Sequence, residues 1–174
     1  LMNYVLFDYG EAKTQKKVPH IMKNAKKLIF PRYHQLEVVN KLTTDVRRKG
    51  VGKTYLIQHS AGSGKSNSIT WLVYKLIKEC PDTMEAIRAK GLDIPLFNSV
   101  IIVTDRRLLD KQITDNLKAF GHTQKIIAHA NSSAELKTAI ENNKRIIITT
   151  IQKFPYICDS IKDVSDHNFA ILID

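Results

Sequence analysis

Residues 59–66 read His-Ser-Ala-Gly-Ser-Gly-Lys-Ser, and they give the most specific indication of the fold in this chain. Its two glycines, at 62 and 64, allow the main chain to curl so that successive N–H groups point into one concavity. A helix that begins near Lys65 would add the positive end of its dipole. The Lys65 ammonium would reach the β and γ phosphates of a nucleoside triphosphate, and the Ser66 hydroxyl would bind Mg²⁺. We therefore predict a triphosphate-binding loop made of Ser60, Ala61, Gly62, Ser63, Gly64, Lys65 and Ser66.

The residues on either side of this loop agree with that prediction, because a phosphate-binding loop joins a strand to a helix. Lys53–Gln58 predicts a strand through its Tyr-Leu-Ile core, and Lys65–Cys80 predicts a helix with apolar residues at helical spacing. The first position of the G-x-x-x-x-G-K-[ST] pattern holds His59 instead of glycine. The order of strand, loop and helix favours a nucleotide site over the alternative, a plain glycine turn.

Short apolar runs alternate with amphipathic helical segments in the rest of the chain. Continuous Ile and Val runs are typical of strands buried on both faces, which requires helices on both sides of a mostly parallel sheet. Further strands are predicted at Val100–Val103, Lys125–Ala128, Arg145–Thr150 and Phe169–Ile173, and further helices at His34–Arg48, at Arg106–Phe120 and from Ser132, with a capping-box Glu135, to Ile140. We expect an α/β fold of three layers.

Asp174 directly follows the apolar run Phe169–Ile173 and is the candidate second half of a magnesium site. A phosphate-binding loop needs a carboxylate across the sheet that holds the metal through water. We therefore predict Ser66 and Asp174 as the metal-binding pair, and Lys65 and Asp174 as the catalytic residues. The alternative is an aspartate that ends a strand in a turn.

The composition bounds the class of protein. The chain has 174 residues and a net charge of +10, with 43% hydrophobic and 25% charged residues, which are the values of an ordinary globular domain. Its two cysteines cannot build a disulfide scaffold, and its six histidines show no zinc-site spacing. No apolar run approaches the roughly 20 residues that cross a bilayer. We expect a cytoplasmic protein without a membrane partner.

Four segments, in order, carry a resemblance to a known family. They read Phe-Pro-Arg-Tyr-His-Gln at 30–35, Gln-His-Ser-Ala-Gly-Ser-Gly-Lys-Ser at 58–66, Val-Thr-Asp-Arg-Arg-Leu-Leu-Asp-Lys-Gln at 103–112, and Thr-Thr-Ile-Gln-Lys-Phe at 149–154. From Phe30 to Asp174 the chain resembles the motor of type I restriction-modification R subunits, which are helicase-like DNA translocases of superfamily 2. The resemblance implies the first RecA-like lobe of an enzyme that uses ATP and Mg²⁺ to move on double-stranded DNA before cleavage.

The resemblance also implies roles for residues outside the loop. Gln35 would read adenine, because a side-chain amide can both donate to and accept from its edge. The residues that would contact DNA are Thr104, Arg106, Arg107, Thr150 and Gln152. Capping or solvated-surface roles remain alternatives for this set. Asp174 would begin a D-E-A-H box.

The implied partners and boundaries follow from the same family. The partners are double-stranded DNA, the methyltransferase and specificity subunits, and a second RecA-like lobe whose absence would leave this lobe almost without ATPase activity. Residues 1–50 hold 11 Lys and Arg against four acidic residues, and we interpret 1–28 as a basic linker from an upstream domain, with Glu11-Ala12-Lys13 as linker and not a nuclease centre. Residues 29–174 would form the lobe. An RNA or DNA helicase lobe of another superfamily 2 protein and a small-molecule kinase remain alternatives.

Overall fold

The computed structural model describes residues 6–8, 27–78, 95–105, 113–117, 126–157 and 164–174. Its helices and strands, in chain order, are β1 (Leu6–Asp8), β2 (Lys27–Ile29), α1 (Tyr33–Lys49), α2 (Lys65–Lys78), β3 (Ser99–Thr104), β4 (Ile127–His129), α5 (Ser133–Glu141), β5 (Ile146–Thr150), the 3-10 helix η2 (Ile151–Tyr156) and β6 (Phe169–Ile173). A further helical turn spans 113–117. Within these ranges, none of the helices combines the length and apolar character needed to span a bilayer.

A four-stranded parallel sheet forms the centre of the fold, with the strand order β4-β5-β3-β6. Every residue of β3 and of β5 is buried, as the Ile and Val runs predict. The edge strand β6 is different, because Ile171 is 56% exposed and Ile173 is 74% exposed. The expectation that every apolar run is buried on both faces is therefore wrong for β6, which has a neighbour on one side only.

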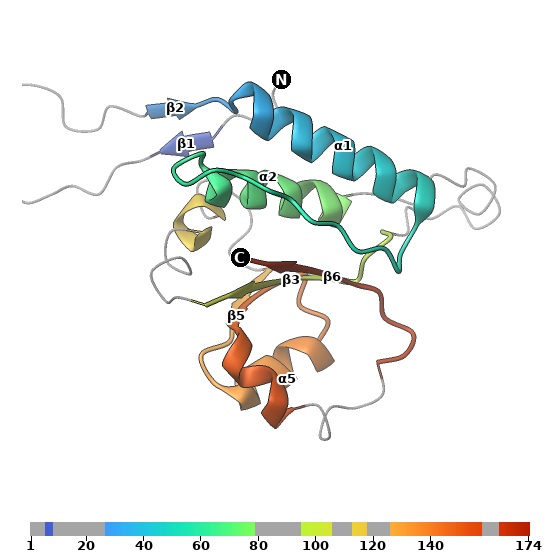
Figure 1. Cartoon of the computed structure of the whole chain (residues 1–174). Coiled ribbons are helices and arrows are strands. Elements are labelled where there is room, and N and C mark those ends of the chain that lie inside the picture. Colours follow the sequence, from blue (N-terminus) through green and yellow to red (C-terminus); the bar gives the residue numbers. More distant parts are fainter. Residues whose placement is uncertain (1–5, 9–26, 79–94, 106–112, 118–125, 158–163) are drawn as a thin grey trace, which may run out of the picture.

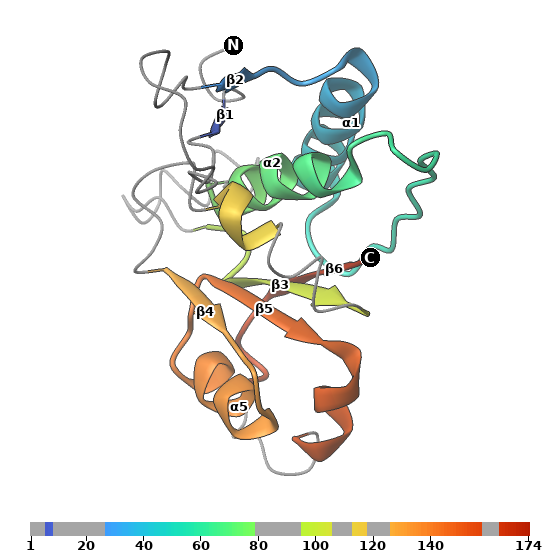
Figure 2. The same ribbon diagram turned by 90° about the vertical axis from the view of Figure 1, so that its left-hand side faces the viewer.

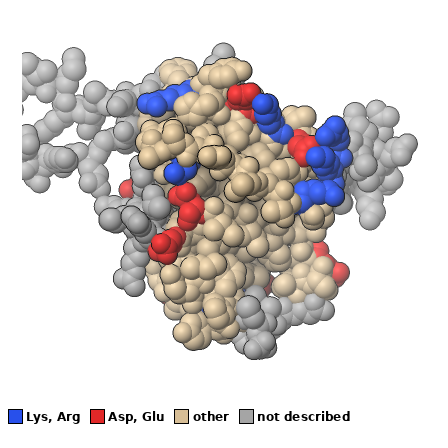
Figure 3. Space-filling model, in the orientation of Figure 1, with Lys and Arg blue, Asp and Glu red and all other residues tan. Residues whose placement is uncertain are grey.

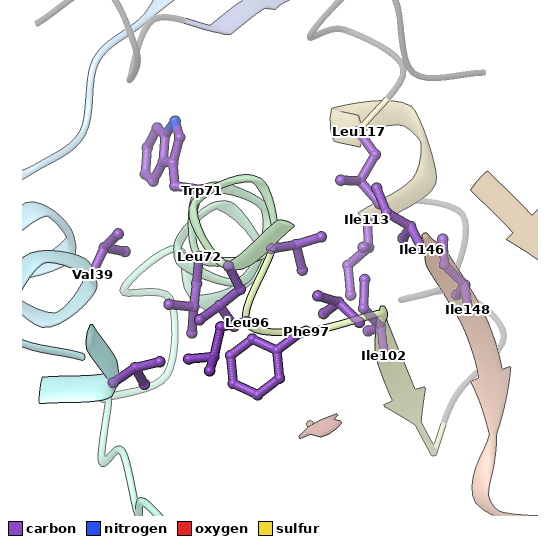
Figure 4. Packing of buried hydrophobic residues seen from close by; sticks show 14 residues of the cluster. Val39, Trp71, Leu72, Leu96, Phe97, Ile102, Ile113, Leu117, Ile146 and Ile148 are labelled. Carbon is purple, nitrogen blue, oxygen red and sulfur yellow. The ribbon is translucent and has the colours of Figure 1, made fainter. Parts of the chain in front are cut away.

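Two hydrophobic clusters cover the two faces of the sheet and create the three layers (Figure 1). On one face, Ile102 and Ile148 belong to a cluster that includes Trp71 and Leu72 of α2 and extends to Val39 of α1 (Figure 4). On the other face, alternate sheet residues such as Ile101 and Ile147 pack with Leu136, Ala139 and Ile140 of α5. The side-chain period of two along each strand explains this division. The predicted three-layer α/β fold, with a parallel sheet consistent with a RecA-like lobe, is confirmed.

The helices form close to where their sequence patterns predict them. In α1 the residues Val39 and Val46 are buried, and the helix ends at Gly50, whose positive φ of 71° favours glycine. In α5 the N-cap Ser132 accepts a hydrogen bond from the Glu135 main-chain N–H at 3.2 Å. The Glu135 carboxylate accepts from the N–H of Asn131 at 2.7 Å, one residue earlier than a capping box requires.

The predicted strand Lys53–Gln58 is wrong. The segment has no regular secondary structure, and its side chains face solvent, with Leu56 99% exposed. A strand needs a partner for its main-chain hydrogen bonds, and this segment adds to neither sheet of the described structure. Its contact with the fold is instead a hydrogen bond from the Tyr55 hydroxyl to Asp45 of α1 at 3.0 Å.

The structure also adds a feature to the predicted basic linker. Leu6–Asp8 pairs antiparallel with Lys27–Ile29, so the two ends of the 1–28 segment meet in a short ribbon. Several predictions lie outside the described residues: the linker interpretation of Glu11–Lys13, the end of the helix predicted to Cys80, and most of the helix predicted at Arg106–Phe120.

Candidate nucleotide-binding site

The loop before α2 has the backbone geometry that its two glycines predict. Gly62 has φ of 73° and Gly64 has φ of 83°, a left-handed region that other residues rarely adopt. The Ser63 N–H donates to the Ser60 carbonyl at 3.3 Å and closes a turn. The carbonyl of Gly64 then accepts from Asn67 and Ser68 at 3.1 and 3.3 Å and begins the hydrogen-bond ladder of α2.

The start of α2 offers main-chain donors to a ligand. The first N–H groups of a helix have no intrahelical acceptor, so those of Lys65 and Ser66 are available. The helix dipole adds positive potential at the same place. The Lys65 side chain is exposed and Ser66 is half-buried, so both can meet a ligand from solvent. Positive-φ glycines, free amides and an exposed ammonium together fit a polyphosphate.

The loop lies at the edge of the sheet where ligands of open α/β folds bind. Figures 1 and 2 show the N-terminus of α2 on the side to which the carboxyl ends of β3 and β6 point. Open parallel sheets bind their ligands outside these carboxyl ends. The N–H of Asp174, just after β6, donates to the Val103 carbonyl at 3.0 Å and holds Asp174 beside the end of β3. The loop and Asp174 therefore both lie at the edge of the sheet formed by the carboxyl ends of its strands.

The magnesium pair stays a prediction. Asp174 is half-buried, as is Ser66, so neither side chain is sealed from solvent. No group of three or more His, Cys, Asp or Glu side chains suited to a metal occurs in the described part of the chain. A pair made of one hydroxyl and one carboxylate, completed by phosphate oxygens and water, is the arrangement that Mg²⁺ favours at such sites.

Gln35 lies beneath the loop and is 3% exposed. Its Nε2 donates to the carbonyl of Gly64 at 2.9 Å and to that of Ser63 at 3.3 Å, while its Oε1 accepts from the N–H of Arg32 at 2.8 Å. Both donor hydrogens are thus directed at the loop, and one lone pair of Oε1 is left. The structure joins Gln35 to the predicted loop, and the adenine role stays a prediction.

Two histidines contact the same loop, and the sequence assigns neither of them a role. The Nε2 of His34 lies 3.1 Å from the Ser63 carbonyl oxygen, and the ring centroids of His34 and His59 are 5.6 Å apart. The available signals are the position of His34 next to Gln35 and the replacement of the first glycine of the loop pattern by His59. Neither signal indicates a contact between them.

Two of the residues predicted to contact DNA are neighbours in the sheet. Thr104 and Thr150 lie opposite each other at the carboxyl ends of β3 and β5, and they are 1% and 9% exposed. Gln152 is exposed on η2. Arg106 and Arg107 lie outside the described residues. Among the described members of the set, Gln152 is therefore the one whose side chain is open to a partner.

The Thr-Thr-Ile-Gln-Lys-Phe segment also has a structural role. The Lys153 ammonium donates to the Ala130 carbonyl at 2.6 Å, and the Thr149 hydroxyl lies 3.5 Å from the same oxygen. These contacts tie η2 and β5 to the residue that follows β4. They account for Thr149 and Lys153 without a ligand, and they hold η2 at the carboxyl edge of the sheet.

Basic side chains gather at the far end of α1 (Figure 3). They are Arg47, Arg48 and Lys49 in the last turn, and Asp45 pairs with Arg48 at 2.9 Å and with Lys49 at 2.8 Å. At 1.5 Å per helical residue, this turn lies roughly 20 Å along the axis from His34. The local positive charge is partly neutralised and remote from the loop, so it does not define the nucleotide site.

The chain was compared with known protein families and with curated proteins. The family model described as SWI2/SNF2 ATPase matches residues 34–174, from the first turn of α1 to the end of β6. No curated protein matches the chain.

Proposed function

The chain belongs to the SWI2/SNF2 ATPase family, a group of helicase-like ATPases, and we propose that it is the first, ATP-binding lobe of the motor in a type I restriction enzyme R subunit. The observation that carries the nucleotide-binding part is the loop Ser60–Ser66, with both glycines in the left-handed region and α2 beginning at Lys65. The type I assignment rests on the four ordered segments, and in particular on 32–35 and 149–154.

Two residues of the loop, Lys65 and Ser66, and two residues outside it, Asp174 and Gln35, have proposed roles toward ATP and Mg²⁺. The N–H groups of Lys65 and Ser66 donate to phosphate oxygens, and the Lys65 ammonium offsets the negative charge that develops on the γ phosphate. The Ser66 hydroxyl and the Asp174 carboxylate would hold Mg²⁺, which would supply positive charge against the phosphates. Gln35 supports the loop and offers the free lone pair of its Oε1 to the amino group of adenine.

The proposed partner is double-stranded DNA, bound at the carboxyl edge of the sheet. The buried Thr104 and Thr150 end their strands at this edge, and the exposed side chain of Gln152 follows them in the chain, which supports a contact of Gln152 with the sugar-phosphate backbone. Arg106 and Arg107 come two and three residues after the end of β3 and would add charge. A second RecA-like lobe, the methyltransferase and specificity subunits, and a basic linker over 1–28 complete the proposed enzyme.

The test measures the rate of ATP hydrolysis by the full-length enzyme, here called the parent, which would contain this lobe and the second RecA-like lobe. The rate is compared with duplex DNA, with RNA and without nucleic acid. We expect stimulation by duplex DNA and displacement of a triplex-forming strand as the motor moves. The Lys65→Ala parent serves as control and should show neither. Stimulation by RNA alone would favour the helicase alternative, and phosphorylation of a small acceptor without any nucleic-acid effect would favour the kinase. Either result would refute the translocase proposal.

A further inference from the structure

Three hydrogen bonds join the first turn of α1 to the carbonyl groups of the loop. One comes from His34 to Ser63, at 3.1 Å, and two come from the Gln35 amide to Ser63 and Gly64. A carbonyl oxygen can only accept, so the Nε2 of His34 must carry a hydrogen. Two consecutive side chains of one helix therefore act on two consecutive peptide groups of the loop.

The direction of these carbonyls determines the direction of the loop amides. In a trans peptide the C=O of one residue and the N–H of the next point to opposite sides. No cis peptide occurs in the described residues. With the Ser63 carbonyl directed to His34, the Gly64 N–H points away from α1. In the same way, the bond from Gln35 to the Gly64 carbonyl turns the Lys65 N–H away from α1. Both amides are then set to face a ligand before it arrives.

The ring of His59, which directly precedes the loop, packs against the ring of His34. Its ring centroid lies 5.6 Å from that of His34 at an interplanar angle of 56°, within the range in which aromatic rings attract. Both rings are half-buried. The contact restricts the rotation of the His34 side chain, and it gives a physical use to a histidine where the loop pattern has glycine.

We propose that His34 is a positioning residue that presets the nucleotide loop through Ser63, with His59 as the residue that holds its ring in place. The inference rests on the proposed function, because it assigns His34 a role toward the same bound triphosphate. Preorganised donors bind more tightly because their ordering cost is met before association. His34 would act through the main chain without touching the nucleotide.

The first experiment needs no nucleotide. Hydrogen exchange, followed by mass spectrometry, is compared over residues 60–68 in the wild type and in His34→Phe, which retains a ring against His59 but has no donor. The N–H groups of Ser63, Asn67 and Ser68 donate within this segment and report its order. We expect faster exchange there and unchanged exchange in α5. Unchanged exchange over 60–68 would overturn the proposal.

A matched control is His167→Phe, because His167 is also half-buried and has a ring neighbour in Phe169, but it precedes the amino end of β6. It should leave exchange over 60–68 as in the wild type, and an equal rise in this control would also overturn the proposal. If His34→Phe fails to fold, His59→Ala decides the question. Faster exchange over 60–68 in that variant supports the positioning role, and wild-type exchange contradicts it.

A second experiment measures the Kd of a fluorescent ATP analogue. Loss of one neutral hydrogen bond predicts binding about 3- to 10-fold weaker in His34→Phe, with partial rescue in His34→Gln, whose amide restores a donor. Equal affinity in the wild type and His34→Phe would contradict the role in binding. If the wild type itself binds no nucleotide, the proposed function fails, while the exchange experiment still decides whether His34 orders the loop.

Discussion

The Nε2 atom of Gln35 lies 2.9 Å from the carbonyl oxygen of Gly64, so the first turn of α1 supports the loop that opens α2. A Cβ atom added to Gly64 would lie 2.5 Å from the same Nε2. The glycine is therefore required twice, by its φ of 83° and by the close approach of Gln35. The same contact with Gln35 thus supports the loop and explains why its second glycine stands at position 64.

This relationship predicts that Gly64→Ala is more harmful than Gly62→Ala. Both substitutions strain a positive φ, at about 1–2 kcal/mol each. Gly62 has no heavy atom within 4 Å of its added Cβ, whereas Gly64→Ala also displaces the Gln35 amide and its hydrogen bonds. We expect Gly64→Ala to lower the free energy of unfolding by about 1–2 kcal/mol more than Gly62→Ala in urea denaturation. Equal losses would contradict the contact with Gln35.

The hydrogen bonds of Arg145, far from the loop, predict that its replacement lowers the free energy of unfolding. Its guanidinium donates to the carbonyl of Ile77 at 2.6 Å and to those of Phe97 and Asn98 at 3.1 Å each. The three bonds tie the end of α2 to the segment before β3. Arg145→Ala should lower the free energy of unfolding by about 2–4 kcal/mol, because charge-assisted bonds are lost and carbonyls remain unpaired. Arg145→Lys should restore only part of the lost free energy of unfolding, since an ammonium group cannot reproduce the planar, forked guanidinium. A loss in Arg145→Ala below about 1 kcal/mol would contradict this role.

Asp45 predicts a titration at low pH. The pKa of the Asp45 carboxyl is lowered from its ordinary 3.8 to about 2, chiefly by a hydrogen bond from Lys49 and also by bonds from Arg48 and Tyr55, against the opposing effect of burial. Because the folded pKa lies below the unfolded one, the stabilisation is present above about pH 4 and disappears as the pH falls through about 2. Carboxyl NMR should place the midpoint near 2, moving upward at high salt. A midpoint near 3.8 would refute these ion pairs.

The sequence predicts those elements whose signal is local. The Ile-rich runs of β3 and β5 are buried because each carries apolar side chains to both faces of the sheet, and Ser132 caps α5 through a residue three positions away. A run such as Lys53–Gln58 has strand-forming residues too. It forms no strand in the structure, because strand formation depends on a hydrogen-bond partner that its own residues do not specify.

In the candidate site, too, features with a local sequence signal are predicted, and contacts between distant segments are not. The glycine spacing of the loop predicts its positive φ values at Gly62 and Gly64, which the structure has. The contacts of His34 and Gln35 with Ser63 span 29 and 28 residues and depend on how α1 packs against α2. Their side chains are equally suited to a helix surface, so only the packed structure shows that both support the loop. The resemblance to the restriction-enzyme motor therefore implies an adenine role for Gln35 and assigns no role to His34.

The proposed DNA contact predicts a change in salt dependence. If Arg106 neutralises a phosphate, Arg106→Gln in the parent enzyme should weaken binding equally for all duplex sequences and reduce the slope of log affinity against log salt by about one unit. Lys41→Gln is the control, because Lys41 pairs with Glu37 at 2.7 Å on α1, away from the carboxyl edge of the sheet. An unchanged slope in Arg106→Gln would show that Arg106 does not neutralise a DNA phosphate.

Binding of a nucleoside triphosphate by the Ser60–Ser66 loop can be tested by measuring ATP binding to Lys65→Ala. The Lys65 side chain is exposed, so the variant should keep its unfolding temperature, as should the control Lys144→Ala. Loss of a charged hydrogen bond to phosphate predicts a Kd about 10- to 100-fold higher in Lys65→Ala and unchanged in the control. A folded Lys65→Ala chain that binds ATP with Mg²⁺ as tightly as the wild type would show that the loop is not the nucleotide site.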